Sequence, residues 1–431
     1  LSTVFILSGV STQSRTAQID GSVWSMVKAL EEYLYIVGGA LLGCCMAKPK
    51  SSSRRKASFP ILMYADTRTS SDQLYLGKFG VPDAFISFKK GAKSYAVLSQ
   101  LEFSRGLKVS AFDTILSLEE WMANARKHFR RSDVGIAEVI ATLGKAYRMS
   151  GFRVSGDFPA WLAFELRDLG FEVKAAQGTI FPARETKSEE EILHLKEGNR
   201  CSAIGIRAAD KALQASAIKR GYLYFDGKRL TSERLREIIE VACLMAGAVS
   251  LDTIAAGGDQ ACDPHCNGSG PIKANELIIV DVFPCVSKTG YHGDMTRTFL
   301  KGTPSDAQRA LVAAVGGAQK QAVEQVTTGV NGKAIHTSIV NYFDERGYKT
   351  ERTENGAVGF FHGTGHGLGL DVHEAPRISS VNYKLKRDSV VTVEPGLYYP
   401  GLGGCRIEDV VAVTDDEPRM LSSYHYKWIV K

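Results

Sequence analysis

Residues 276–300, which read ELIIVDVFPCVSKTGYHGDMTRTFL, decide the fold of the second half of the chain. The first eight residues are rich in β-branched side chains and predict a strand, and a second strand is expected to begin near Asp294. Asp281 interrupts the apolar run, and a carboxylate buried there is unfavourable unless a cation or hydrogen bonds compensate it. The stretch therefore predicts a hairpin that presents two acids to a common partner.

A second pair of acids repeats this arrangement further along the chain. Residues 389–394, SVVTVE, form an apolar run that ends in Glu394, and residues 405–413, CRIEDVVAV, contain Glu408. The second pair is fourteen positions apart and the first pair thirteen. A glycine-rich loop is expected between the acids of the second pair. The nearly equal spacings indicate an internally duplicated fold.

The segment between the two pairs is rich in glycine and histidine. Residues 360–374 read FFHGTGHGLGLDVHE and hold His362, His366 and His373, three of the nine histidines in the chain. The glycines let the backbone pass close to a bound group. A single acid or histidine is most often a solvated or hydrogen-bonded residue, so the prediction depends on the whole set.

Four carboxylates gathered in an interior of low dielectric repel one another, and metal ions are the usual remedy. Hard oxygen ligands with one imidazole suit Mn²⁺, Co²⁺, Fe²⁺ or Zn²⁺ better than a thiolate-bound metal. Bridging carboxylates fit a pair of ions about 3.5–4 Å apart. The pattern therefore predicts a dinuclear metal site that carries out hydrolysis.

The expected elements divide the chain into two folded parts. Alternating strands and helices over residues 58–185 favour a small α/β domain, whereas residues 186–431 mix helices and antiparallel strands in the manner of an α+β domain. The boundary is placed near 186, where an acidic segment predicts a helix start. Helices are expected at 70–79, 118–129, 136–149, 159–168, 189–216, 232–246, 304–325 and 332–346, and strands at 59–65, 84–88, 94–98, 152–154, 171–174, 276–283, 293–300, 389–394 and 406–414.

Residues 1–57 do not predict a folded domain. Their apolar stretch, 34–46, is shorter than the roughly 20 residues that a membrane-spanning helix needs. The basic run 48–56 follows this stretch, whereas a signal peptide places its positive charge first. We interpret 1–57 as a disordered or non-native extension, with Met46 as the candidate start, and keep an amphipathic membrane anchor as the alternative.

Charge and cysteine content limit the remaining classes of function and the cellular location. The net charge is +6 and the basic residues are mostly spread along the chain, so nucleic-acid binding is not predicted. The eight cysteines stand at irregular positions and form no disulfide framework, which favours a reducing, cytoplasmic location. Cys262 and Cys266 flank His265 and leave a zinc half-site as an alternative, although no second pair with suitable spacing follows.

Taken in order, these motifs resemble the metallopeptidase family with the pita-bread fold, which includes methionine aminopeptidase, aminopeptidase P and prolidase. The resemblance covers about residues 187–431 and comprises a strand Asp, GDMTRT, HGTGHG, VEPG and RIED. The preceding small domain resembles the creatinase-type domain of the aminopeptidase P and prolidase branch. Phe283-Pro284 and a longer loop before Asp294 depart from the family pattern and put the shape of the substrate pocket in question.

The resemblance implies roles for individual residues. Asp294 and Glu408 would bridge two divalent ions, with Mn²⁺ expected first and Co²⁺, Zn²⁺ or Fe²⁺ as alternatives. Glu394 would also shuttle a proton, and Arg406 would hold a group on the proline side or orient a ligand carboxylate. The implied metal ligands are Asp281, Asp294, His366, Glu394 and Glu408, and the implied substrate-side histidines are His265, His362 and His373. His373 and His362 are the candidates for contacting the substrate carbonyl.

The resemblance also implies an activity. The expected reaction is hydrolysis of the Xaa-Pro bond at the N-terminus of a peptide with proline second, and the alternative is an Xaa-Pro dipeptidase. A non-enzymatic binding protein on the same fold is a further alternative, although such relatives typically lose metal ligands. Creatinase-like chemistry without metal is disfavoured because all five implied metal ligands are present in this chain. A homodimer is implied, and no membrane partner is expected.

Overall fold

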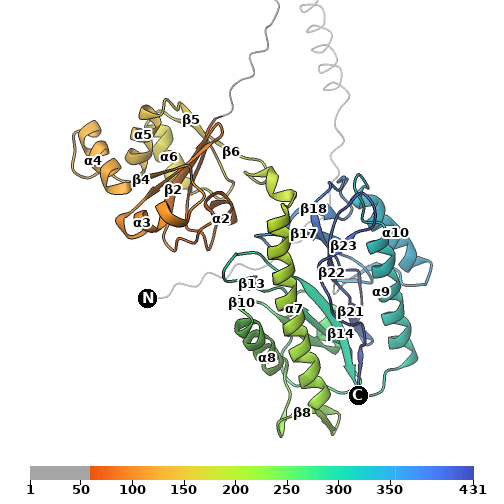
Figure 1. The fold of residues 1–431 in the computed structure, drawn as a ribbon. Helices are drawn as coiled ribbons and strands as arrows, with labels where there is room; N and C mark the ends of the chain where they lie inside the picture. Colours follow the sequence, from red (N-terminus) through yellow and green to blue (C-terminus); the bar gives the residue numbers. More distant parts are fainter. Residues whose placement is uncertain (1–58, 355) are drawn as a thin grey trace, which may run out of the picture. The chain divides into compact units, whose positions relative to one another are not determined.

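The computed structural model describes residues 59–354 and 356–431 (Figure 1). The expected extension 1–57 lies outside the described residues. Residues 58–431 form one compact unit by their contacts, so the predicted domain boundary near 186 stays a prediction. Among the helices of the described ranges, none has the length and apolarity needed to cross a membrane.

The first part of the described chain is a mixed six-stranded sheet with the order β4-β3-β2-β1-β5-β6. Gly91, with φ of 60°, makes the turn of the predicted hairpin between β2 and β3. The strands are β1 (Ile61–Ala65), β2 (Phe85–Lys90), β3 (Lys93–Leu98), β4 (Thr114–Ser117), β5 (Gly151–Val154) and β6 (Glu172–Ala175). The helices are α2 (Ser71–Gly77), α3 (Gln100–Val109), α4 (Leu118–Phe129), α5 (Ile136–Ala146) and α6 (Ala160–Asp168).

The second part begins with the short helix η1 (Pro182–Glu185) and continues with four long helices. The start of α7 is set by a capping box, in which Ser188 accepts from the Glu191 amide and Glu191 accepts from the Ser188 amide. Ser305 and Gln308 cap α9 in the same way. The long helices are α7 (Glu189–Ala215), α8 (Ser232–Met245), α9 (Asp306–Glu324) and α10 (Gly332–Asp344).

The strands of this part form two larger sheets, with orders β11-β12-β14-β24 and β18-β17-β19-β22-β23, and several short hairpins. The bounds are β7 (Ala217–Lys219), β8 (Tyr222–Phe225), β9 (Lys228–Arg229), β10 (Ala248–Val249), β11 (Ile254–Gly257), η2 (Gly258–Cys262), β12 (Ile278–Val282), β13 (Cys285–Val286), β14 (Met295–Lys301), β15 (Glu351–Thr353), β16 (Gly356–Val358), β17 (Gly365–Gly367), β18 (Glu374–Ile378), β19 (Val390–Val393), β20 (Gly396–Tyr399), β21 (Gly403–Arg406), β22 (Asp409–Ala412), β23 (Arg419–Met420) and β24 (Ile429–Val430).

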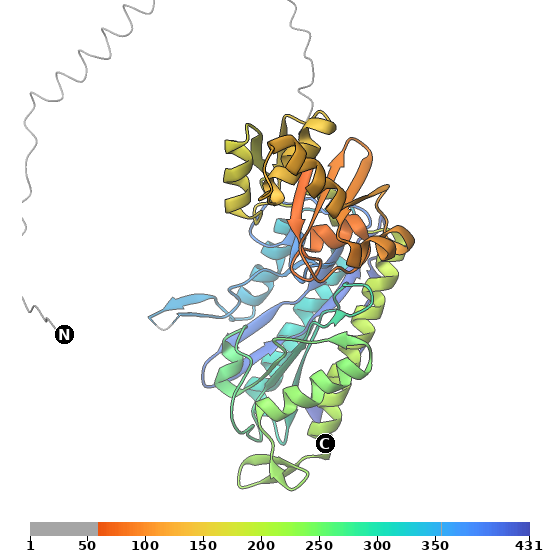
Figure 2. The same ribbon diagram turned by 90° about the vertical axis from the view of Figure 1, so that its left-hand side faces the viewer.

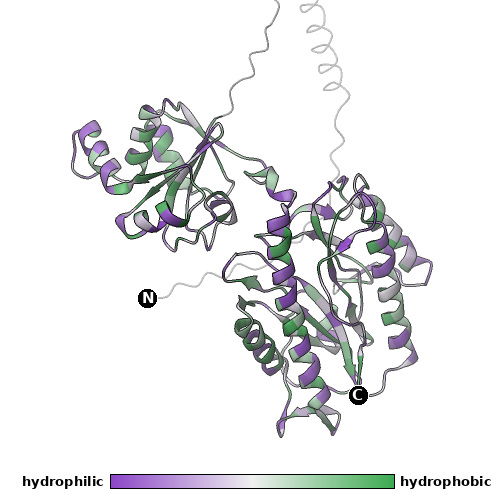
Figure 3. Cartoon of the chain, viewed as in Figure 1, coloured by the Kyte–Doolittle hydropathy of each residue, from purple (hydrophilic) through white to green (hydrophobic). Residues whose placement is uncertain are grey.

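Each of these two sheets is covered by a pair of helices (Figures 1 and 2). Buried side chains of α7 and α8 pack on the β11-β12-β14 sheet, and those of α9 and α10 pack on the sheet that contains β19 and β22. The helices alternate hydrophobic and hydrophilic residues along their length, as expected for elements with one buried face (Figure 3). The predicted α+β fold is confirmed, and the two sheet-and-helix halves agree with the repeated pattern of acids.

The sequence prediction was wrong in one detail between the second pair of acids. The expected glycine-rich loop contains the hairpin β20-β21, and Glu408 lies between β21 and β22 instead of inside a strand. The turn between the two strands contains Gly401 with φ of 86°, a conformation that other residues rarely reach. Val393 pairs with Asp409, so β19 and β22 bring Glu394 and Glu408 to the same end of the sheet.

Candidate metal centre

The first two predicted ligands come from neighbouring strands of one sheet. Asp281 lies in β12, and Asp294 immediately precedes β14. The antiparallel register pairs Asp281 with Thr296, so the two acids lie close together across the strand pair. All residues of β12 are buried, including Asp281, which explains why an acid in this strand needs a compensating group.

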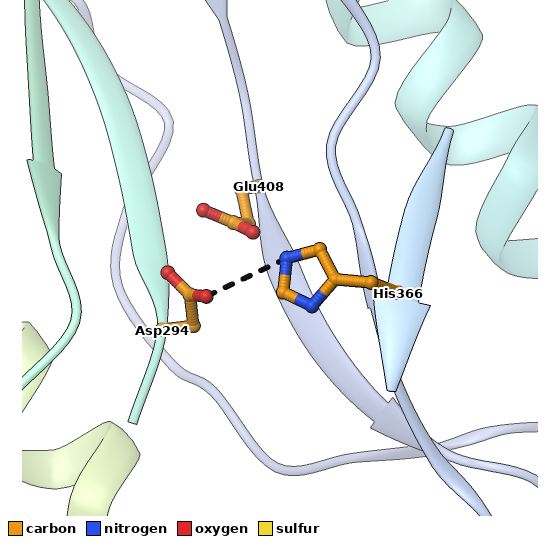
Figure 4. A group of neighbouring side chains, drawn as sticks. All are labelled: Asp294, His366 and Glu408. Carbon is orange, nitrogen blue, oxygen red and sulfur yellow. Dashed lines mark ion pairs between the residues drawn. The ribbon is translucent and has the colours of Figure 1, made fainter. Parts of the chain in front are cut away.

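The other three predicted ligands come from the second sheet. His366 lies in β17, and its Nε2 is 3.3 Å from an oxygen of Glu394 and 3.8 Å from an oxygen of Asp294. Ligand atoms of Asp294, His366 and Glu408 all lie within 4.8 Å of one another (Figure 4). The side chains point toward a common centre between the two sheets.

Hydrogen bonds fix the orientation of these side chains. The Thr296 hydroxyl donates to Glu408 at 2.8 Å, and the Asn199 side chain accepts from the Asp294 amide at 3.3 Å. The His366 Nδ1 donates to the Gly367 carbonyl at 3.1 Å, which leaves the Nε2 lone pair directed at the acids. Such outer contacts fix the tautomer of a metal-binding imidazole.

The electrostatics of the cluster are those of a site that needs a cation. Burial, followed by the charges of neighbouring acids, raises the pKa of Asp294 and Glu408 well above the usual range. Burial also raises the pKa of Glu394 to about 7, and it lowers the pKa of His366 to about 3. The second carboxylate oxygen of Asp281 is buried without a hydrogen-bond partner. An unpartnered carboxylate oxygen, a neutral imidazole and crowded acids fit divalent metal ions.

Arg406 is directed at a predicted ligand. Its guanidinium donates to Asp281 at 2.7 Å, to the Tyr398 hydroxyl at 3.0 Å and to the Thr296 hydroxyl at 3.3 Å. The side chain is 4% exposed, so these partners leave little of it for a substrate. Of the two roles expected for Arg406, the contacts favour orienting a ligand carboxylate.

His362 is held by protein groups at both ring nitrogens. Its Nδ1 donates to the Gly363 carbonyl at 2.8 Å, so its Nε2 accepts from the Tyr398 hydroxyl, also at 2.8 Å. Burial, followed by the charge of Arg406, lowers the pKa of His362 to about 3. The ring is therefore neutral and has no free proton for a substrate carbonyl in this arrangement. Tyr398 was missed in the sequence because nothing in VEPGLYYP marks its hydroxyl as a bridge.

The acids face a cavity of about 840 Å³. His265 and His373 line it and are exposed, and Phe283, which replaces the small residue expected there, lines it too. The cavity thus brings together all nine residues predicted for the site: His265, Asp281, Asp294, His362, His366, His373, Glu394, Arg406 and Glu408.

Arg377 is a cavity residue that the sequence reasoning missed. It lies in β18, eleven positions after His366, and is exposed. In the part of the chain that the structure describes, its guanidinium makes no hydrogen bond or ion pair. The alternation of buried Pro376 and Ile378 around it is the sequence signal that would have placed Arg377 on an open face.

The zinc alternative at Cys262 and Cys266 finds no support in the geometry. Within residues 59–354 and 356–431, the acidic cluster with His366 is the one group of three or more potential ligand residues close enough to hold an ion. Burial raises the pKa of the Cys262 thiol to about 12, which disfavours the thiolate that would bind zinc.

The fold and the site together define a metal-dependent hydrolase. Residues 194–415, just over half of the chain, match metallopeptidase family M24, and the chain belongs to this family. This family match confirms the resemblance to pita-bread metallopeptidases that the sequence motifs predicted.

Individual relatives agree with the family. The chain is 34% identical over 255 residues to the Xaa-Pro dipeptidase of Pyrococcus furiosus, which covers 58% of this chain and 67% of that protein. It is 32% identical over 255 residues to the Xaa-Pro dipeptidase of Pyrococcus horikoshii, covering 58% and 66%. The matched region thus spans about two thirds of the length of these relatives.

Solved structures show the same fold over most of the chain. An X-Pro aminopeptidase from Thermotoga maritima superposes with a TM-score of 0.71 at 22% identity, covering 86% of this chain and 97% of the other. An Xaa-Pro dipeptidase from Bacillus anthracis gives a TM-score of 0.72 at 23% identity, covering 86% and 95%. Both alignments extend beyond the matched family region and include residues of the first part.

Proposed function

We propose that this metallopeptidase hydrolyses the bond between an N-terminal residue and a following proline, in the manner of an Xaa-Pro aminopeptidase. The observation that carries the proposal is the convergence of Asp294, His366 and Glu408 on one centre at the base of a large cavity. The names of the relatives supply the proline preference, since they are Xaa-Pro dipeptidases and an X-Pro aminopeptidase. The intact ligand set disfavours a non-enzymatic binding protein.

An Xaa-Pro dipeptidase is the second candidate, and a specific residue favours it. A dipeptide carries a free carboxylate next to its proline, and Arg377 offers a cavity-facing guanidinium with no protein partner among the described residues. Guanidinium groups bind carboxylates through paired hydrogen bonds. The two Pyrococcus relatives described above are both named as Xaa-Pro dipeptidases.

We infer that the site holds two divalent ions, because hard oxygens and one imidazole suit Mn²⁺, Co²⁺, Fe²⁺ or Zn²⁺, and the family resemblance makes Mn²⁺ the first choice. Asp281, Asp294, His366, Glu394 and Glu408 would be the ligands, with Asp294 and Glu408 in the bridging positions. When bound, such a pair of ions acidifies a water molecule and polarises a carbonyl oxygen.

The surrounding side chains have separate roles in this proposal. Glu394 would accept a proton from the attacking water and return it to the leaving nitrogen, since its carboxylate lines the cavity beside the other proposed ligands. His373 donates a hydrogen bond to the substrate carbonyl, and exposed His265 contacts the proline side. Arg406 holds Asp281, and Tyr398 holds Arg406 and His362 in place.

The proposal extends to the assembly and location of the enzyme. A homodimer is inferred from the family resemblance. A cytoplasmic location is inferred from cysteine usage, with which the six free cysteines of the described residues agree.

The test uses protein stripped with a chelator and reloaded with Mn²⁺, incubated separately with Xaa-Pro dipeptides and Xaa-Pro-Xaa tripeptides. Mass analysis of the products distinguishes the outcomes. Release of the first residue from the tripeptide establishes the aminopeptidase, and cleavage of the dipeptide alone establishes the dipeptidase. If neither is cleaved with Mn²⁺, Co²⁺ or Zn²⁺, the proline-specific proposal is wrong.

A further inference from the structure

Five charged side chains from three separate segments meet outside the metal centre, and we call them the linker cluster. The cations come from the segment that leads into α7, and the acids come from α2, from the loop between β17 and β18, and from the first residue of β18. The two cations are buried, Asp72 and Glu374 are half-buried, and the Asp371 side chain is 48% exposed. The members are Arg184, Lys187, Asp72, Asp371 and Glu374.

Arg184 is the centre of the cluster. Its side chain is 8% exposed and donates to Asp72 at 2.8 Å, Asp371 at 2.7 Å and Glu374 at 2.6 Å. Lys187, whose side chain is 1% exposed, donates to the other oxygen of Glu374 and to the Arg184 carbonyl. A planar guanidinium with several donors can join three carboxylates in this way, whereas an ammonium group acts as a point charge.

The acids bound by Arg184 flank a residue of the proposed active site. Asp371 and Glu374 enclose His373, whose ring lies 4.3 Å from the ring of His366 at 81°. His373 makes no side-chain hydrogen bond to the described residues, so its direction depends on the backbone of residues 369–374. Arg184 binds the carboxylates of Asp371 and Glu374 and thereby holds this backbone on both sides of His373.

Helix α2 supports the same segment. The Ser71 hydroxyl donates to Asp371 at 2.5 Å and to the Leu370 carbonyl at 3.2 Å. Leu74 packs against the buried cluster that contains Leu370 and Tyr291. The amide of His292, two residues before Asp294, donates to the Gly369 carbonyl at 2.9 Å. One short helix therefore packs on the segment that carries His373 and on the loop that leads to a proposed metal ligand.

We propose that Arg184 is a positioning residue for peptide hydrolysis, which binds α2 to residues 371–374 and thereby sets the direction of the His373 imidazole. The inference rests on the proposed function, because it assumes that His373 contacts the substrate carbonyl. It adds a task for the first part of the chain, since Asp72 and Ser71 belong to α2. Arg184 itself does not touch the reacting atoms.

The test compares Arg184→Met, Arg184→Lys, Asp72→Asn, His373→Ala and the double variant Arg184→Met/His373→Ala as full-length, Mn²⁺-loaded protein. Displacement of a catalytic group by about 1 Å through a distant mutation can lower activity by about 100-fold. We expect Arg184→Met to lower kcat to that extent with KM within about twofold and metal content unchanged, and Arg184→Lys to recover part of the loss. Because Arg184 acts through His373, the double variant is expected to be no slower than His373→Ala.

A second readout is independent of catalysis. Hydrogen exchange in peptides covering residues 369–378 is expected to increase in Arg184→Met and Asp72→Asn relative to the wild type. The matched control is Arg419→Gln, because Arg419 forms an exposed ion pair with Glu189 at the start of α7 and surface pairs contribute little. The control is expected to keep wild-type kcat and exchange.

The outcomes separate this inference from the proposed function. A wild-type enzyme that cleaves no Xaa-Pro peptide overturns the proposed function, and the exchange measurement then decides whether Arg184 fixes the segment. Unchanged kcat and exchange in Arg184→Met overturn the positioning role. The positioning role is also overturned if the fold-losses in kcat of the two single variants multiply in the double variant, because this shows that Arg184 and His373 act separately.

Discussion

At the scale of single residues, Asp294 is the proposed metal ligand whose contacts are most informative. It approaches His366, shares its centre with Glu408 and has its amide held by Asn199. As the proposed bridging ligand, Asp294 would contribute to both ions, so its loss should remove the pair.

Asp294→Asn is therefore expected to abolish metal-dependent peptide hydrolysis and to lower the bound metal measured by elemental analysis. The substitution keeps the shape of the side chain and removes its charge. Asp252→Asn is the matched control, because Asp252 lines the same cavity but is exposed and lies outside the ligand group. Retained turnover in Asp294→Asn would contradict the ligand assignment.

The raised pKa values of the acids predict that metal binding depends on pH. Ligand carboxylates must be deprotonated to bind metal, and in the metal-free protein Glu394 keeps its proton up to a pKa of about 7. The affinity for Mn²⁺ should therefore fall as the pH falls through about 7, with more protons released on binding at pH 6 than at pH 8. His366, with its pKa lowered to about 3, is neutral throughout this range and should contribute no proton.

Calorimetry in two buffers of different ionisation heat measures this proton release directly. The same titration of Glu394→Gln should show less proton release at pH 6, because the titrating group is gone. Proton release close to zero at both pH 6 and pH 8 in the wild type would show that the acids are already ionised without metal.

At the scale of elements, the contact between α7 and the loop before β14 sets the position of Asp294. Gly198 in α7 lies against the backbone of His292 and Gly293, and a Cβ built on Gly198 would meet their atoms at 2.5 Å. Only a residue without a side chain lets the helix approach this closely. The helix would have to move away from the strand to accept anything larger.

Gly198→Ala is expected to destabilise the protein by about 1–3 kcal/mol, because overpacking forces the backbone to shift. Gly316→Ala in α9 is the matched control, since its Cβ would meet only the Ile407 side chain at 3.7 Å. The control should be neutral or stabilising by up to about 1 kcal/mol, the difference in helix propensity between glycine and alanine. Denaturant unfolding checks both, and a stabilised Gly198→Ala would contradict the close contact.

The observed helices and strands also show which sequence signals were sufficient to predict them. The start of α7 was predictable because Ser188 and Glu191 form a capping box, and β12 because its residues are apolar and β-branched. Helix α3 was missed because only a few scattered apolar residues mark it and Gly106 interrupts it. The hairpin β20-β21 was missed because its glycines read as a loop.

At the scale of the whole molecule, the site is assembled from segments that are far apart in the sequence. The five proposed ligands could be singled out because each stands in a short string whose composition is unusual for an acid or histidine. Tyr398 and Arg377 could not be predicted in this way, since their roles depend on which groups the fold brings near them. The linker cluster likewise depends on a contact between Asp72 and Arg184 that no local pattern encodes.

The proposed function of the whole molecule requires a pair of metal ions held by the five proposed ligands. The most direct measurement is turnover of an Xaa-Pro-Xaa peptide during stepwise addition of Mn²⁺ to chelator-stripped protein, with bound metal counted per chain. Turnover should be absent without metal and should reach its plateau at two ions per chain. Full turnover by metal-free protein, or a plateau at one ion per chain, would contradict the dinuclear centre.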